Sequence, residues 1–231
     1  MLDGSGMVLA TAGSFVGTHF ALSHPLRRPL IAALGEKAFS GIYSLVAAVT
    51  LGATVWAYRA APITEPAWDV GDGLWALSTF LMLVASILLL GSLVRNPALP
   101  GAEGQAATAK ATGVYGITRH PMMWAFAIWG VSHILVLPIA KNIILSAAII
   151  VLSLVGAAFQ DQKKARLDPQ GWMAWQSRTS YLPLVAIAQG RAKFGAFGMH
   201  AILGGVVVWL VATWAHIPLA GWPAGIWRWV G

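Results

Sequence analysis

The sequence predicts an all-α integral membrane protein, a polytopic helix bundle with about six transmembrane helices. Of its 231 residues, 58% are hydrophobic and only 10% are charged, whereas a soluble domain averages about 25% charged residues. The mean hydropathy is +0.70. Apolar stretches long enough to cross a bilayer alternate along the chain with shorter polar segments. Twelve tryptophans fit this class, because tryptophan concentrates at membrane boundaries.

The apolar stretches follow one another in a single transmembrane domain over residues 1–231. Proline-containing breaks separate the predicted spans, which are residues 5–23, 39–59, 73–94, 121–139, 141–160 and 196–216. The first span carries Gly13 and Gly17 in a GxxxG spacing, which favours close helix packing. The connection 95–119 is rich in Gly and Ala, and we expect it to be flexible.

The fourth span begins at an Arg-His-Pro corner, Arg119 to Pro121. Proline at a first helical position starts a helix without losing a hydrogen-bond donor. His133 lies twelve residues into the predicted helix, roughly 18 Å from its start. An ionisable side chain at that depth predicts a functional site.

Lysine and arginine gather in alternate loops. The loops 24–38, 95–119 and 161–195 hold 12 of the 15 basic residues, so the positive-inside rule places these loops in the cytoplasm and both termini on the opposite side. This topology and contact with lipid headgroups account for the net charge of +7. The expected partners on this ground are membrane lipids, and no nucleic acid.

The chain has no cysteine, which excludes thiolate haem ligands and iron–sulfur clusters. Imidazole is then the natural axial ligand for a haem iron. The six histidines are His19, His24, His120, His133, His200 and His216. We expect His24 and His216 at the membrane interface, because both sit at predicted helix ends, while His200 could face the bundle. His133 is the first candidate ligand and His19 the second.

The stretch from Gly113 to Leu135, GVYGITRHPMMWAFAIWGVSHIL, resembles the signature of the NnrU family of bacterial membrane proteins. That family is similar to the plant and cyanobacterial 15-cis-zeta-carotene isomerases. Three further stretches agree, namely Thr18 to Glu36, Arg95 to Pro97 and Gln162 to Ile187, so the resemblance covers most of residues 15–190. It implies a bacterial inner membrane protein, with both termini in the periplasm on the topology above.

The resemblance also implies haem b and a lipophilic or small-molecule substrate. In the isomerase branch, histidines on membrane helices hold the haem, and its iron assists rotation about a carotenoid double bond. The matching positions are His133 and His19, which would be the iron ligands and the residues on which catalysis depends. The NnrU branch is associated with denitrification and nitric oxide handling. Gly130 replaces a cysteine of the isomerases, so a cysteine ligand switch cannot operate here.

The placement of these two histidines leaves a question open. His19 falls near the cytoplasmic end of its predicted helix, and His133 lies deeper by about 10 Å. Two axial nitrogens on one iron lie only about 4 Å apart. Either the first helix is shifted inward or His133 has another partner.

Basic residues near the predicted cytoplasmic face are candidates for binding the haem propionates. Arg27, Arg28 and Arg119 carry guanidinium groups that match carboxylates bidentately, and His120 lies next to Arg119. Contact with lipid headgroups on the same face is the structural alternative.

Two other function classes stay open. The corner after a Gly-x-Tyr also resembles the membrane methyltransferases that act on isoprenylcysteine and phosphatidylethanolamine. Those enzymes bind S-adenosylmethionine with this corner and a later acidic pair, at which Gln160 and Asp161 stand here. The third class is a non-enzymatic haem sensor or assembly factor.

Overall fold

The computed structural model describes residues 4–99, 102 and 104–230, and all regular structure in those ranges is helical. The long helices are α1 (Gly4–Ser23), α3 (Glu36–Ala60), α4 (Asp72–Gly91), α6 (Pro121–Val136), α7 (Ala140–Leu167) and α10 (Met199–Ala220). The short helices are α2 (Arg27–Leu34), α5 (Val114–Ile117), α8 (Pro169–Arg178), α9 (Val185–Ala188) and α11 (Trp227–Val230). The predicted all-α class is confirmed.

Within the described ranges, α3, α4, α7 and α10 are long and apolar enough to cross a membrane. The apolar helix α6 has 16 residues and is shorter than these four. Helix α1 has 20 residues but is not among the four. In each of the four membrane-length helices, only 11–22% of the most apolar window is buried inside the protein. Most of the surface of these four helices therefore faces outward, as lipid contact requires.

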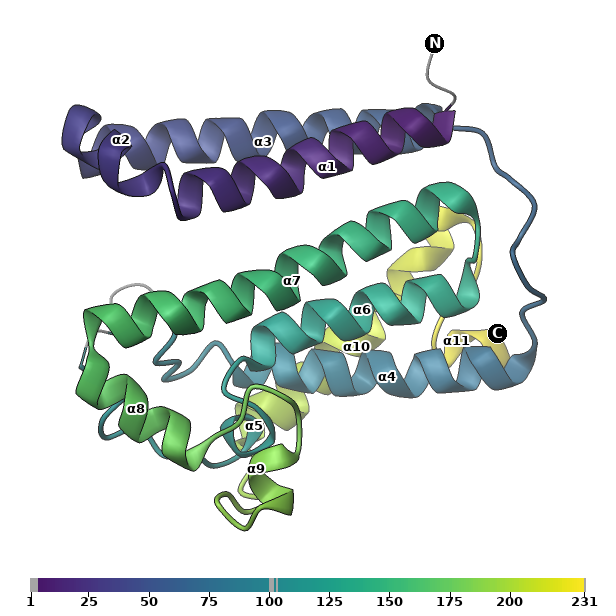
Figure 1. Ribbon diagram of the computed structural model, residues 1–231. Coiled ribbons are helices and arrows are strands. Elements are labelled where there is room, and N and C mark those ends of the chain that lie inside the picture. The colour runs from purple at the N-terminus through teal and green to yellow at the C-terminus, as the bar shows by residue number, and fades with distance from the viewer. Residues whose placement is uncertain (1–3, 100–101, 103, 231) are drawn as a thin grey trace.

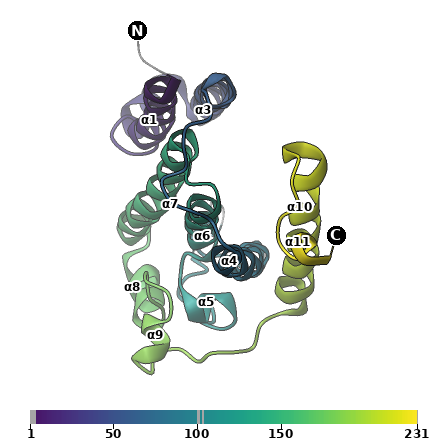
Figure 2. The same ribbon diagram turned by 90° about the vertical axis from the view of Figure 1, so that its right-hand side faces the viewer.

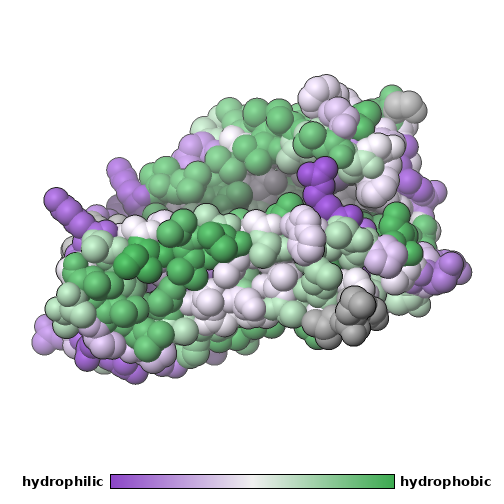
Figure 3. All heavy atoms as spheres, turned by 90° about the horizontal axis from the view of Figure 1, so that it is seen from above, coloured by the Kyte–Doolittle hydropathy of each residue, from purple (hydrophilic) through white to green (hydrophobic). Residues whose placement is uncertain are grey.

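The long helices form a curved row in the spatial order α3, α1, α7, α6, α4, α10 (Figures 1 and 2). Helix α10 packs mainly against α4, at one end of the row, and α3 packs mainly against α1, at the other. Figure 3 looks down on the α1–α3 side and shows apolar residues over the middle of the molecule, with hydrophilic residues mainly toward its two ends. The predicted bundle is therefore an open row, with broad apolar faces available to lipid.

Because the chain crosses back and forth, its connections gather at two opposite ends (Figure 1). We call the end with α2, α8 and α9 the basic end, since the basic segments 24–38 and 161–195 lie there. We call the opposite end, with the linker 61–71 and α11, the terminal end. Helix α1 begins and α11 ends at the terminal end, so both ends of the described chain share one side, as expected. That this side is the periplasm stays a prediction.

Several predicted helix boundaries shift, and those of α6, α7 and α10 bear on the site. Helix α7 continues to Leu167, past the expected end at 160, and Gln160 and Lys164 donate to the carbonyls of Ala98 and Leu99 there. Helix α6 ends at Val136 instead of 139, before Pro138. Helix α10 spans 199–220 instead of 196–216 and carries Pro218 inside it.

Small residues set the helix spacing at positions other than the predicted pair. A Cβ added at Gly13 or Gly17 would meet nothing within 4 Å, so the GxxxG prediction of helix packing is wrong within this chain. At Gly130 of α6, an added Cβ would lie 2.9 Å from the Ser146 carbonyl oxygen of α7. At Gly205 of α10, it would lie 2.8 Å from the Cα of Ile87 in α4. These two glycines therefore allow the close approaches.

The described part of the connection 95–119 packs against neighbouring helices instead of forming the expected flexible loop. Ala98 and Ala106 are buried. Arg178 of α8 donates to the carbonyls of Ala106 and Ala107 at 2.9 and 3.0 Å. The Tyr115 hydroxyl donates to the Val94 carbonyl at 2.9 Å.

Candidate functional site

The Arg-His-Pro corner forms a sharp entry into α6 at the basic end. Pro121 occupies the first turn of α6, as the sequence predicts, and the His120 carbonyl accepts from the Trp124 backbone N–H at 3.0 Å. The Thr118 hydroxyl is hydrogen-bonded to the Tyr181 carbonyl at 2.7 Å, and the Arg119 backbone N–H donates to the Ser180 carbonyl at 2.9 Å. The corner is thus held against the segment that follows α8.

Asp161 of α7 binds both side chains of the corner. Its carboxylate accepts from Arg119 Nε at 2.8 and 3.0 Å, and its Oδ1 lies 2.6 Å from His120 Nε2. His120 is 2% exposed and Asp161 is 9% exposed. The carboxylate therefore neutralises Arg119, whose side chain is only 12% exposed, and a largely buried charge needs such a partner.

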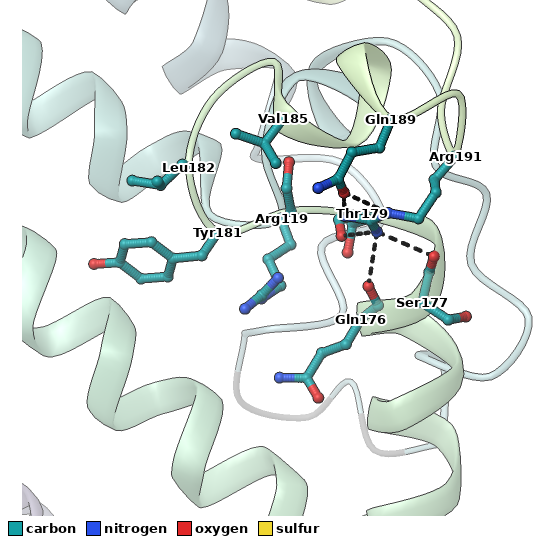
Figure 4. A pocket seen from close by; sticks show the side chains of 10 residues that line it. Arg119, Gln176, Ser177, Thr179, Tyr181, Leu182, Val185, Gln189 and Arg191 are labelled. Atoms are coloured by element: carbon teal, nitrogen blue, oxygen red, sulfur yellow. Dashed lines mark hydrogen bonds between the residues drawn. The ribbon is translucent and has the colours of Figure 1, made fainter.

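A pocket of about 540 Å³ opens beside the corner (Figure 4). Its lining comes from Arg119 and from the stretch around α8 and α9: Gln176, Ser177, Thr179, Ser180, Tyr181, Leu182, Val185, Gln189 and Arg191. Arg191 donates to the carbonyls of Gln176, Ser177 and Thr179, which closes the C-terminal end of α8. Burial raises the pKa of the Tyr181 phenol, and the Asp161 carboxylate raises it further. Arg119 is bound to Asp161 and Arg191 to backbone carbonyls, so both arginines of this pocket are already engaged by protein groups.

His133 lies in the last turn of α6, near the terminal end, because α6 is shorter than predicted. Its Nδ1 is 2.8 Å from the Trp129 carbonyl oxygen, and its ring packs on the Trp129 ring with centroids 4.1 Å apart. A carbonyl only accepts, so Nδ1 carries the proton and Nε2 keeps its lone pair. The side chain is therefore oriented as a metal-binding imidazole commonly is.

His216 of α10 faces His133 across the space between α6 and α10. The ring centroids lie 6.2 Å apart, and the ring planes are inclined by 34°. His216 Nδ1 is 2.8 Å from the Ala212 carbonyl oxygen, so it is oriented in the same way as His133. The sequence reading placed His216 at the interface and missed this contact.

His19 lies near the basic end, away from His133. Its Nδ1 is 2.9 Å from the Phe15 carbonyl oxygen, and its ring packs edge-on to Tyr43. The adjacent Phe20 contacts Phe159 of α7. His133 lies beside the opposite end of α7, since its backbone carbonyl accepts from the Asn142 side chain at the start of that helix.

Asn142 contacts His133, and Phe159 contacts Phe20, the neighbour of His19. At the rise of an α-helix, these two positions of α7 are about 25 Å apart. The structure therefore does not bring His19 and His133 together, and a single iron cannot bind both in this fold.

The four expected propionate-binding residues also lie at the basic end. Arg27 pairs with Glu36 at 2.7 Å, and Arg28 is exposed on α2. Arg119 and His120 are bound to Asp161, and the length of α6, about 20 Å, separates them from His133. The structure places these four residues at the same end as His19 and not beside His133.

A family model described as NnrU protein matches residues 7–224. The chain belongs to the NnrU family. The match includes all six long helices except the first residues of α1, and it includes the corner, Asp161, His133 and His216. No curated protein and no solved structure matches the chain.

This NnrU-family chain holds, in its described ranges, no group of three or more His, Cys, Asp or Glu side chains placed to bind a metal ion. A haem differs from such a site, because the macrocycle supplies four ligands and the protein needs to supply only one or two axial ligands. In the described ranges, His133 and His216 are two histidines whose rings face each other. Asp161 was also missed as a partner of the corner, although an acidic residue closing an apolar segment is a signal for a nearby cation.

Proposed function

We propose that this NnrU-family protein is a membrane haem protein that binds haem b through His133. The main observation behind this proposal is the orientation of His133. The Trp129 carbonyl fixes its Nδ1 atom, which leaves Nε2 for a metal. Two features of its surroundings support this. Trp129 packs on the imidazole, and α6 and α10 pack against α4 more than against each other.

When bound, haem supplies a redox-active iron that can accept electron density from a substrate double bond or bind a small diatomic ligand. The Trp129 carbonyl of this chain orients the proposed iron ligand. The similarity to zeta-carotene isomerases favours isomerisation of a lipophilic substrate that enters from the bilayer, and the association of the NnrU branch favours a role in nitric oxide handling. A haem sensor or assembly factor needs the same bound haem without turnover.

Haem binding is tested by titrating haem into the detergent-purified protein after expression with ample haem supply. The expected result is a low-spin, six-coordinate absorption spectrum that saturates at about one haem per chain. A folded, monodisperse protein that stays colourless after the titration overturns the proposal.

A second candidate function rests on the pocket beside the corner. Arg119 lines this pocket and belongs to the sequence that resembles the S-adenosylmethionine site of membrane methyltransferases. Against this function, Arg119 and His120 are both held by Asp161.

Calorimetry with S-adenosylmethionine separates the two functions. Binding that is lost in Arg119→Ala, in a protein whose absorption spectrum does not respond to haem, establishes the methyltransferase class and rejects haem. No heat of binding with the wild-type protein rejects the methyltransferase class.

A further inference from the structure

The buried face of α10 carries His216 toward the protein. Ala201, Gly205, Trp209 and Thr213 are buried at intervals of four residues, which marks one face of the helix. His216 follows Thr213 by three residues and so continues that face.

The spacing between His133 and His216 suits one iron held between two imidazoles. Two iron–nitrogen bonds of about 2 Å place the coordinating nitrogens about 4 Å apart and the ring centroids about 6 Å apart. The observed centroid separation is 6.2 Å. Both Nδ1 atoms bind backbone carbonyls, which leaves the two Nε2 atoms as the ligand nitrogens.

The other histidines lie too far from His133 to bind the same iron. His19 and His120 lie toward the basic end, and His24 packs on Phe159 near that end. His200 begins α10 and lies about 24 Å along the helix from His216.

We propose that His216 supplies the second axial ligand of the haem, so that the haem is held between α6 and α10 at the terminal end. This inference rests on the proposed function, since it assigns the second ligand of the same haem. It replaces His19 in that role. It also gives α10, which packs mainly on α4, a direct tie to α6 that forms when haem binds.

The test compares the wild-type protein with His216→Ala, His19→Ala and His200→Ala, each purified in detergent and titrated with haem. The readouts are the absorption spectrum and the electron paramagnetic resonance of the ferric form. For His216→Ala we expect a high-spin ferric signal and haem affinity weaker by at least about tenfold. Added imidazole should restore the low-spin signal. His19→Ala and His200→Ala should match the wild type.

A His216→Met variant covers the case in which His216→Ala does not fold. Methionine is an axial ligand of haem iron and raises its potential, so this variant should stay low-spin with an upshifted reduction potential. An unchanged potential and spectrum in His216→Met overturns the inference.

The outcomes separate this inference from the proposed function. A wild-type protein that takes up no haem ends both. A wild-type protein that binds low-spin haem, with His216→Ala unchanged and His19→Ala high-spin, leaves the haem function in place and returns the second ligand to His19.

Discussion

Asp161 shows how one side chain can hold a segment of the fold in place. It reaches from α7 to Arg119 and His120, both on the segment that leads into α6. The sequence allowed Pro121 to be placed at the start of a helix, because proline has a fixed backbone preference that depends on few neighbours. It did not show the partner of the corner, since that partner lies 42 residues away from Arg119 and comes close only when α6 and α7 pack.

We predict that Asp161→Asn lowers the free energy of unfolding by about 3–5 kcal/mol, because it leaves the largely buried Arg119 side chain without its counter-charge. The measurement is the unfolding midpoint in detergent. Asp72→Asn is the control, since the Arg228–Asp72 pair is exposed and such pairs contribute little.

Haem binding should survive Asp161→Asn at temperatures where the variant is folded, because the corner lies about 20 Å from His133 along α6. A variant that is as stable as the wild type but has lost haem would instead make the corner part of the haem site.

At the scale of helices, the existence of each long element was predictable and its packing face was not. Length and hydropathy identify a membrane helix. In a membrane, however, both the lipid-facing and the protein-facing sides are apolar, so periodicity does not reveal which residues pack. This is why Gly13 and Gly17 were wrongly favoured and why the contact between His133 and His216, on helices far apart in sequence, was missed.

We predict that Gly130→Ala destabilises the protein by about 1–3 kcal/mol, because the added methyl group collides with the backbone of α7. Gly17→Ala is the matched control. Its methyl group meets no neighbour, and alanine favours a helix over glycine by about 0.5–1 kcal/mol. Unfolding midpoints of the two variants in detergent should move in opposite directions. Equal midpoints would show that α6 and α7 are not as close as described.

The same geometry bears on the cysteine that the isomerases carry at the position of Gly130. A side chain at position 130 would point into the contact between α6 and α7, because a Cβ added at Gly130 meets Ser146 and Ile150 of α7. We therefore predict that Gly130→Cys does not create a thiolate-ligated haem. The absorption spectrum of that variant, where it folds, should keep the bands of the wild type, and a shift to a thiolate spectrum would contradict this placement.

At the scale of the whole molecule, the open row of helices separates a basic end from a terminal end (Figure 1). The sequence predicted this separation well, because the distribution of lysine and arginine among loops follows the side on which each loop lies. It did not predict that the row stays open, since the order of helices in space depends on contacts between residues distant in sequence.

We predict that both termini are periplasmic, from the placement of 12 of the 15 basic residues in the loops of the other side. Fusions of a periplasm-active phosphatase to the C-terminus should be active, and fusions of a fluorescent reporter that folds only in the cytoplasm should be dark. The opposite pattern would place the Arg-His-Pro corner in the periplasm.

The central claim is that His133 binds haem, and a pyridine haemochrome assay on purified wild-type and His133→Ala proteins tests it most directly. The two proteins are expressed separately under the same conditions, with ample haem supply, and are checked for equal folding by size exclusion. We predict about one haem per chain in the wild type and little or none in the variant, since the variant lacks the proposed axial ligand on α6. Equal haem content and identical spectra in the two proteins would contradict it.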